Sequence, residues 1–177
     1  MSQTDEFHWY AVYTAPRAEK KVSERFTQAE IEHYLPLQKV KHRWSDRVKE
    51  VLVPVVNGYI FVRIPVTGFL KVTAIYGAIA FVREGGRPVA IPDKQLDNLR
   101  IMVENADEPV EYSPKSFDRG ETITIIKGPL EGMMGELIEI KGKHQVVVRL
   151  ERFGYASTTI PMSFIQKEKV TSKQVNS

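Results

Sequence analysis

The stretch Gly120-Glu-Thr-Ile-Thr-Ile-Ile-Lys-Gly-Pro-Leu-Glu-Gly-Met-Met-Gly135 determines the fold of the last third of the chain. Isoleucine and threonine alternate over residues 122–125, which is the period-two pattern of a strand with one buried face. Glycines follow at 128, 132 and 135, and a residue without Cβ enters positive φ freely and lets a neighbouring backbone pass close by. We therefore predict two strands joined by a tight turn.

Further short runs of β-branched and apolar residues follow this stretch. They lie around residues 138–140, 146–150 and 160–162, and each run can bury one face. Four or five such strands predict a small antiparallel β-barrel, whose closure leaves no free edge to aggregate.

The segment from Ile123 to Ile140, together with Val146 to Leu150, Phe153-Gly154 and Phe164, resembles a KOW motif. This small SH3-like barrel ends NusG-type transcription elongation factors and occurs in several ribosomal proteins. The motif alone leaves transcription and translation open. An unrelated SH3-like barrel with the same turn chemistry is a further alternative, since a fold does not fix a function.

Composition limits the class of protein. The chain has 177 residues, of which 42% are hydrophobic and 27% charged, which is typical of one or two globular domains. The net charge of +3 permits an acidic partner such as nucleic acid without requiring one. There is no cysteine, so disulfides and thiolate metal sites are excluded. No stretch reaches eighteen apolar residues, and we expect a soluble cytoplasmic protein.

Two prolines and a loss of periodicity mark a linker between the two halves of the chain. We predict an N-terminal domain at 7–105, a linker at 106–116, the barrel at 117–169 and a disordered tail at 170–177.

The N-terminal domain is predicted to be an antiparallel sheet with flanking helices, so the whole chain is α+β. The expected strands are His8–Thr14, Ile31–Val40, Val48–Val56 and a run after the Asn57-Gly58 turn, with a β-hairpin around Gly85-Gly86. The expected helices are 17–28, 68–75 and one that Pro92 opens.

Two basic segments are candidates for nucleic-acid binding. The first helix carries Arg17, Lys20, Lys21 and Arg25, which form either a ridge that meets phosphates or a solvated face with i,i+4 pairing. The connection between the second and third strands carries Lys41, Arg43, Trp44 and Arg47, and a tryptophan can stack on a base. The alternative is a hairpin tip kept soluble by charge, with Trp44 folded back onto the sheet.

The resemblance to the NusG family extends to the N-terminal half. It rests on Trp9-Tyr-Ala-Val-Tyr13 with the basic helix after it, Asn57-Gly-Tyr-Ile-Phe-Val62, Gly77-Ala-Ile-Ala-Phe-Val82, Pro88 and Ile91-Pro92-Asp93. Domain order, linker position and length agree with the family. This combination favours transcription over the ribosome.

The family resemblance implies partners and sites. An apolar depression of the N-terminal domain receives the clamp helices of the largest RNA polymerase subunit, and the matching residues here are Tyr13, Tyr59, Phe61, Ile79 and Phe81. Such aromatic anchors dominate interface energetics, although we expect at least one of the five to be a buried core residue. The basic helix corresponds to the edge of the family's domain that approaches upstream or non-template DNA.

The resemblance also implies that the KOW barrel recruits a second partner, either a small-subunit ribosomal protein or the termination factor Rho. The matching residues are Phe153, Gly154, Phe164 and Ile165. Tyr155 stands where the family commonly has arginine, which argues against Rho and favours a specialised paralog. We expect a monomer whose C-terminal domain stays a β-barrel and leaves the aromatic depression open.

Catalysis has little support in the sequence. There is no cysteine nucleophile, phosphate-binding glycine loop or zinc-protease motif, and the four histidines have no ligand spacing. We therefore expect neither an enzyme nor a cofactor. The main alternative to a transcription factor is a ribosome-associated KOW protein that binds RNA.

Overall fold

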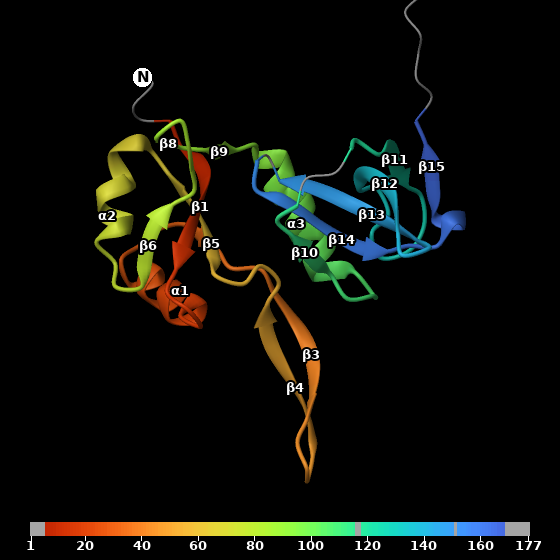
Figure 1. The fold of residues 1–177 in the computed structure, drawn as a ribbon, viewed down its shortest axis with the longest axis horizontal. Coiled ribbons are helices and arrows are strands. Elements are labelled where there is room, and N and C mark those ends of the chain that lie inside the picture. Colours follow the sequence, from red (N-terminus) through yellow and green to blue (C-terminus); the bar gives the residue numbers. More distant parts are fainter. Residues whose placement is uncertain (1–5, 116–117, 151, 169–177) are drawn as a thin grey trace, which may run out of the picture.

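The computed structural model describes residues 6–115, 118–150 and 152–168, which form two packed parts and a projecting hairpin (Figure 1). The first part is an antiparallel sheet with strand order β2-β5-β1-β6, in which β9 also pairs with β1. Its strands are β1 (His8–Thr14), β2 (His33–Tyr34), β5 (Tyr59–Ile64), β6 (Ala78–Phe81) and β9 (Ala90–Ile91). The predicted α+β class and the first strand are confirmed.

Two helices cover one face of this sheet. They are α1 (Glu19–Gln28) and α2 (Phe69–Thr73), and a short 3-10 turn, η2 (Val66–Gly68), precedes α2. The helices bury Val22, Phe26 and Val72 against the even-numbered residues of β1 and β5, because alternate side chains of a strand point to the same face. The two-residue strands β7 (Arg83–Glu84) and β8 (Arg87–Pro88) form the hairpin expected at the paired glycines.

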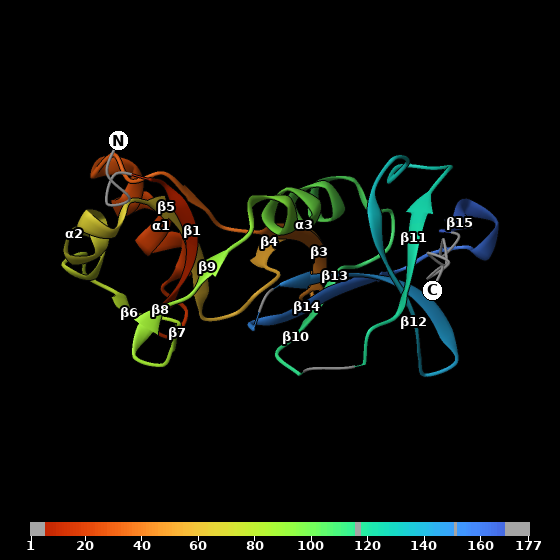
Figure 2. The same cartoon turned by 90° about the horizontal axis from the view of Figure 1, so that it is seen from above.

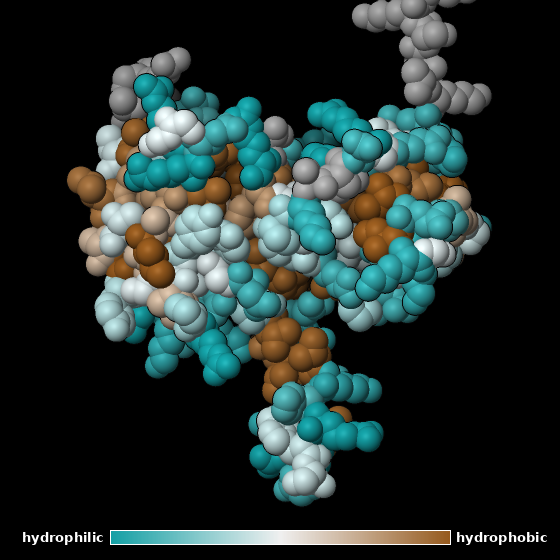
Figure 3. Space-filling model, in the orientation of Figure 1, coloured by the Kyte–Doolittle hydropathy of each residue, from teal (hydrophilic) through white to brown (hydrophobic). Residues whose placement is uncertain are grey.

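A long hairpin of β3 (Leu37–Arg43) and β4 (Val48–Pro54) projects from the sheet (Figure 1). The single strand predicted over residues 31–40 is wrong in one respect, because the chain leaves the sheet after β2 and re-enters a strand at β3. Pro36 lies at this break, and proline has no N–H to donate to a continuing ladder. In Figure 3, hydrophobic side chains gather at the root of the hairpin and hydrophilic ones towards its tip.

The second part is a curved antiparallel sheet with strand order β10-β14-β13-β12-β11-β15, and it confirms that the C-terminal part of the chain is a β-rich domain, as predicted. Its strands are β10 (Glu111–Ser113), β11 (Glu121–Ile125), β12 (Met134–Ile140), β13 (Lys143–Leu150), β14 (Gly154–Thr159) and β15 (Ile165–Lys167), with a 3-10 turn, η3 (Met162–Phe164), before β15.

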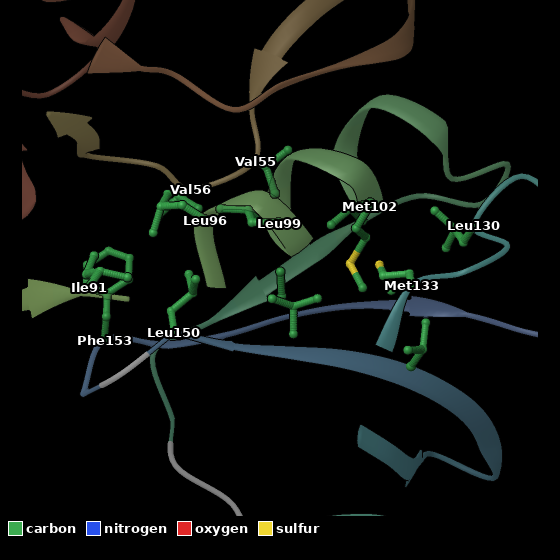
Figure 4. Packing of buried hydrophobic residues seen from close by; sticks show 14 of the residues in the cluster. Val55, Val56, Ile91, Leu96, Leu99, Met102, Leu130, Met133, Leu150 and Phe153 are labelled. Carbon is green, nitrogen blue, oxygen red and sulfur yellow. The ribbon is translucent and has the colours of Figure 1, made fainter. Parts of the chain in front are cut away.

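The helix α3 (Asp93–Asn105) packs against this second sheet, beside β13 (Figure 2). Its side chains Leu96, Leu99 and Met102 are fully buried, and Figure 4 shows them facing Leu150 and Met133 of the second part. Burying one such side chain stabilises by about 1.5–3 kcal/mol. One apolar cluster therefore runs from the N-terminal sheet through α3 into the second sheet.

The segment predicted as a linker is ordered over residues 106–115. β10 lies within it and pairs with β14, and Val110 is buried. The hydroxyl of Thr158 donates hydrogen bonds of 3.1 Å to the carbonyl oxygens of Glu108 and Pro109. This connection is thus part of the second sheet. The predicted tail at 170–177 lies outside the described residues.

Gly154 permits the close pairing of β14 with β10. Its φ is +133°, a backbone conformation that residues with a Cβ rarely adopt. A Cβ at this position would also overlap the carbonyl oxygen of Ser113. Gly142 has φ +74° but open space around the site of its Cβ. A Cβ at position 154 would thus cause both backbone strain and a steric clash, whereas a Cβ at position 142 would cause backbone strain alone.

We predict that Gly154→Ala lowers the free energy of unfolding by about 3 kcal/mol or more, because strain and clash add. Gly142→Ala, which introduces strain alone, should cost about 1 kcal/mol. Urea denaturation followed by circular dichroism measures both. Equal losses would show that Ser113 can move away without cost.

Candidate functional site

Three aromatic side chains lie together on the sheet face opposite α1 and α2. In the β1–β5 ladder Tyr13 pairs with Tyr59 and Ala11 with Phe61, so these side chains share one face. The ring centroids of Tyr13 and Tyr59 are 4.8 Å apart. We call Tyr13, Tyr59 and Phe61 the aromatic face.

Phe153 of the second part fills this aromatic face. Its ring centroid lies 4.6 Å from that of Tyr59 and 5.6 Å from that of Phe61, both nearly edge-on, which is the arrangement that ring quadrupoles favour. Phe61 has no exposed surface and Phe153 is 7% exposed. Tyr112 completes the enclosure, because its hydroxyl donates a 2.6 Å hydrogen bond to the Phe153 carbonyl oxygen.

Two phenols at this contact, those of Tyr59 and Tyr112, have a raised pKa, which favours their neutral form. Burial, with a smaller effect from the hydrogen bond to Tyr13, raises the pKa of Tyr59 to about 12. Burial also raises the pKa of Tyr112. The cluster is therefore an uncharged, largely apolar contact at neutral pH.

The expectation of an open aromatic depression is wrong, because Phe153 occupies it.

The five residues predicted for polymerase binding do not all lie on one surface. Tyr13, Tyr59 and Phe61 are together, and Ile79 is 60% exposed on β6. Phe81 instead lies in the core beneath α1 and α2, with its ring 4.8 Å from that of Phe69. Phe81 pairs with Val12, so it shares the helix-covered face, and its expected place in the depression is a correction.

Gln38, at the root of the β3–β4 hairpin, joins the two parts. Its side-chain Nε2 donates a 2.9 Å hydrogen bond to the Val110 carbonyl oxygen, and its Oε1 accepts a 3.1 Å bond from the Val110 N–H. The amide thus satisfies both backbone groups of a buried residue, as a neighbouring strand would. We call this pair of bonds the Gln38 clamp.

The predicted nucleic-acid residues on the hairpin are brought together at its outer half. Residues 41–50 are all exposed. Lys41 and Arg43 share one face of β3, and Arg47 lies across the turn. The ring of Trp44 is 4.4 Å from His42, and the Arg47 guanidinium lies 5.5 Å from it. Trp44 packs within the hairpin tip and remains 39% exposed.

The predicted basic helix is only partly free. Lys20 donates a 2.5 Å hydrogen bond to the Leu52 carbonyl oxygen of β4, which links α1 to the hairpin. Arg25 donates a 2.8 Å bond to the Tyr76 carbonyl oxygen and lies 5.0 Å from the ring of Tyr76. Arg17 and Lys21 are exposed. Helix and hairpin therefore form one connected surface.

The residues predicted to bind a second partner lie at two places. Phe153 is inside the contact described above, and Gly154 follows it at the start of β14. Phe164 and Ile165 are half-buried at the other end of the second part. There Phe164 lines a cavity of about 230 Å³ whose walls are largely apolar, beside Ile160 and Pro161.

Three elements that form the contact between the two parts are not predicted from the sequence: Gln38, Tyr112 and α3. In the helix that Pro92 is predicted to open, the spacing of Leu96, Leu99 and Val103 gives one apolar face, but a spacing does not say what covers that face. For Gln38 no sequence signal exists, because polar hairpin residues are common.

Comparison with known proteins identifies the family. The family model described as transcription termination factor NusG matches residues 7–100, which is more than half of the chain. The chain belongs to the NusG family. Its members among the relatives below are transcription termination and antitermination proteins.

Two relatives illustrate the similarity to NusG proteins. The transcription termination/antitermination protein NusG of Rickettsia bellii is 26% identical over 183 residues, covering 95% of this chain and 93% of the relative. The protein of the same name from Pseudomonas aeruginosa is 36% identical over 89 residues, covering 48% and 47%.

A solved structure, described as domain interaction in Thermotoga maritima NusG, has a TM-score of 0.53 and 22% sequence identity. It covers 93% of this chain and 98% of the other, so both parts share the NusG fold. Over the described residues, none of the helices has the length and apolar content that a membrane crossing needs.

We predict that Gln38→Ala loosens the contact between the two parts, because it leaves both backbone groups of buried Val110 unpaired. Two net hydrogen bonds of about 1 kcal/mol each correspond to a roughly thirtyfold shift towards separation. Since the chain has no cysteine, fluorophores can be attached at Lys71→Cys and Glu131→Cys and their energy transfer measured.

The matched control is Lys39→Ala, the exposed neighbour on the other hairpin face. Its energy transfer should equal that of the parent. A Gln38→Ala protein with unchanged transfer would mean that the clamp contributes nothing to closure.

Proposed function

We propose that this NusG-family protein binds RNA polymerase through the aromatic face and so modulates pausing, termination or antitermination. The partner element is the pair of clamp helices of the largest subunit, as the family resemblance implies. The observation that carries the proposal is the aromatic face itself, which already accepts Phe153 of the same chain. Aromatic side chains fixed by a sheet make rigid anchors for an apolar partner.

In this proposal the structure corresponds to a closed, resting form. Phe61 is fully buried and its ring contacts that of Phe153, so a clamp helix can reach it only after the second part moves away. The Thermotoga maritima relative, whose description names a domain interaction, supports the relevance of such contacts. Polymerase thus competes with the protein's own C-terminal part for one surface, and only the open population binds.

We further propose that the hairpin and α1 contact the phosphates of nearby upstream or non-template DNA. The support is the exposed cluster at Lys41, Arg43 and Arg47, on the hairpin whose Leu52 carbonyl oxygen accepts a bond from Lys20 of α1. Contacts of this kind position a protein on nucleic acid without reading its sequence. A second basic strip consists of Lys21 on α1 and Arg17 just before it, both exposed.

The KOW part is proposed to recruit a second partner after opening. Separation would expose Phe153, while Phe164 and Ile165 border the apolar cavity. A small-subunit ribosomal protein is the partner that the resemblance favours. The specialised role remains a prediction. The family match over residues 7–100 supports transcription over a ribosome-associated RNA-binding role.

We predict that Phe153→Ala raises the affinity for polymerase about tenfold, because removing the internal competitor frees the aromatic face. The tenfold factor assumes that the ring contacts of Phe153 stabilise the closed form by about 1.4 kcal/mol, which the truncation removes. Binding is measured by biolayer interferometry with a fragment that carries the clamp helices.

Two further variants make this test specific. Phe164→Ala removes an aromatic ring from the same part, away from the aromatic face, and should leave polymerase affinity unchanged. Phe61→Ala should weaken binding by about 1–3 kcal/mol. If Phe153→Ala and Phe61→Ala both bind as the parent does while remaining folded, the aromatic face is not the polymerase site.

For the hairpin, we predict that Lys41→Gln combined with Arg43→Gln reduces the salt dependence of DNA binding. Removing one phosphate interaction should lower the slope of log K against log salt by about 0.9. Fluorescence anisotropy with a short duplex at several salt concentrations gives the slope. The control, Lys141→Gln with Lys143→Gln, removes the same charge from the exposed β12–β13 turn. Identical slopes for the two double variants would show that the hairpin charges do not contact DNA and only keep the tip soluble.

A further inference from the structure

Two adjoining pockets lie where α3 meets the start of β11. Their volumes are about 300 Å³ and 340 Å³, and Arg119 and Arg149 line both. We call the combined feature the interdomain groove. Five cationic residues line it, one on α3, two in the connection between β10 and β11, one on β13 and one in the turn before β14: Lys94, Lys115, Arg119, Arg149 and Arg152.

Glu136 is the carboxylate inside the groove, and it is already bound. Its two oxygens accept bonds of 2.9 Å and 3.0 Å from the Arg149 guanidinium, and Oε1 also accepts a 3.1 Å bond from the Gly120 N–H. The Glu136 side chain is only 16% exposed. A bidentate pair of this kind fixes a guanidinium in one orientation. Glu136 therefore positions Arg149 at the groove wall.

Beyond the Arg149–Glu136 pair, the groove has more cationic side chains than carboxylates. At the rim Arg152 pairs with Glu84 of β7. Glu121, next to the groove, pairs with Lys167 at 2.8 Å. Among the described ion pairs none involves Lys94, Lys115 or Arg119. Asp93, Asp97 and Asp118 are exposed near these elements but do not line the groove. Three positive charges are left without a paired acid.

We propose that the interdomain groove binds a short run of phosphates. Three unpaired cations require a ligand with several negative charges, which a single carboxylate or chloride does not supply. Arginine forks and lysine ammonium groups are the usual ligands of phosphate oxygens, and Asn98 adds a neutral donor at the wall. Two or three consecutive phosphates match the charge. They belong either to a free nucleotide or to a nucleic-acid strand.

The groove is complete only in the closed form. Lys94 belongs to α3, whereas Arg119 precedes β11 and Arg149 lies on β13 of the second sheet, so separation of the sheet from α3 removes one wall. A ligand that binds the closed form better shifts the population towards it. Phosphates in this groove therefore keep the aromatic face covered. This consequence is distinct from the hairpin's contact with DNA.

The test uses the full chain and inorganic tripolyphosphate, with affinity measured by isothermal titration calorimetry. Arg119→Gln and Lys94→Gln should each weaken binding roughly tenfold, the equivalent of losing one charge-assisted hydrogen bond. Lys143→Gln removes one charge from an exposed site of the same sheet, and its affinity should stay within about twofold of the parent. Absence of tripolyphosphate binding, or equal loss in all three variants, would overturn the proposal.

A second readout tests the link to closure. In Phe153→Ala, which favours separation, tripolyphosphate should restore energy transfer between labels at positions 71 and 131, and Lys94→Gln should abolish that restoration. Unrestored transfer would refute the two-part groove. A nucleoside triphosphate and a single-stranded RNA oligonucleotide, compared at equal ionic strength, separate the sources. The source is the ligand that binds more tightly and that tripolyphosphate displaces.

Discussion

The arrangement of this protein depends on burying the apolar side of α3. In sequence the helix belongs to the N-terminal half, but the cluster that encloses it includes both sheets. A helix with one apolar face must cover that face, and here residues of both sheets provide the cover. The Phe153 contact, the Gln38 clamp and the interdomain groove all exist because this packing holds the two parts together.

Several interactions, each of them weak, together stabilise the contact between the two parts. Three aliphatic side chains of α3, two edge-on ring contacts and a pair of amide hydrogen bonds each contribute a small amount. The exposed pair of Arg152 and Glu84 adds little, because surface ion pairs are worth about 0–1 kcal/mol. A contact built in this way can be stable in isolation and still yield to a partner that supplies a comparable apolar surface.

Much of the fold could be predicted because it is local. The aromatic and β-branched run of residues 8–14, the alternation in residues 121–125, the turn at Gly58 and the helix start at Pro92 are encoded within a few residues. Phe81 was misplaced because its face depends on pairing with Val12, a register that sequence alone does not give. The filling of the aromatic face by Phe153 depends on contact between segments that are distant in the sequence. It could not be predicted, because the sequence around a buried phenylalanine has the same pattern as the sequence around an exposed one.

The pairing of β10 with β14 has a consequence for how far the two parts can separate. Between the end of α3 at Asn105 and the start of β10 at Glu111, the backbone can extend to at most about 22 Å. A detached second sheet therefore stays tethered near the surface it left, at an effective concentration in the millimolar range. Recapture is fast under these conditions, so an opened molecule stays open only for as long as its partner remains bound.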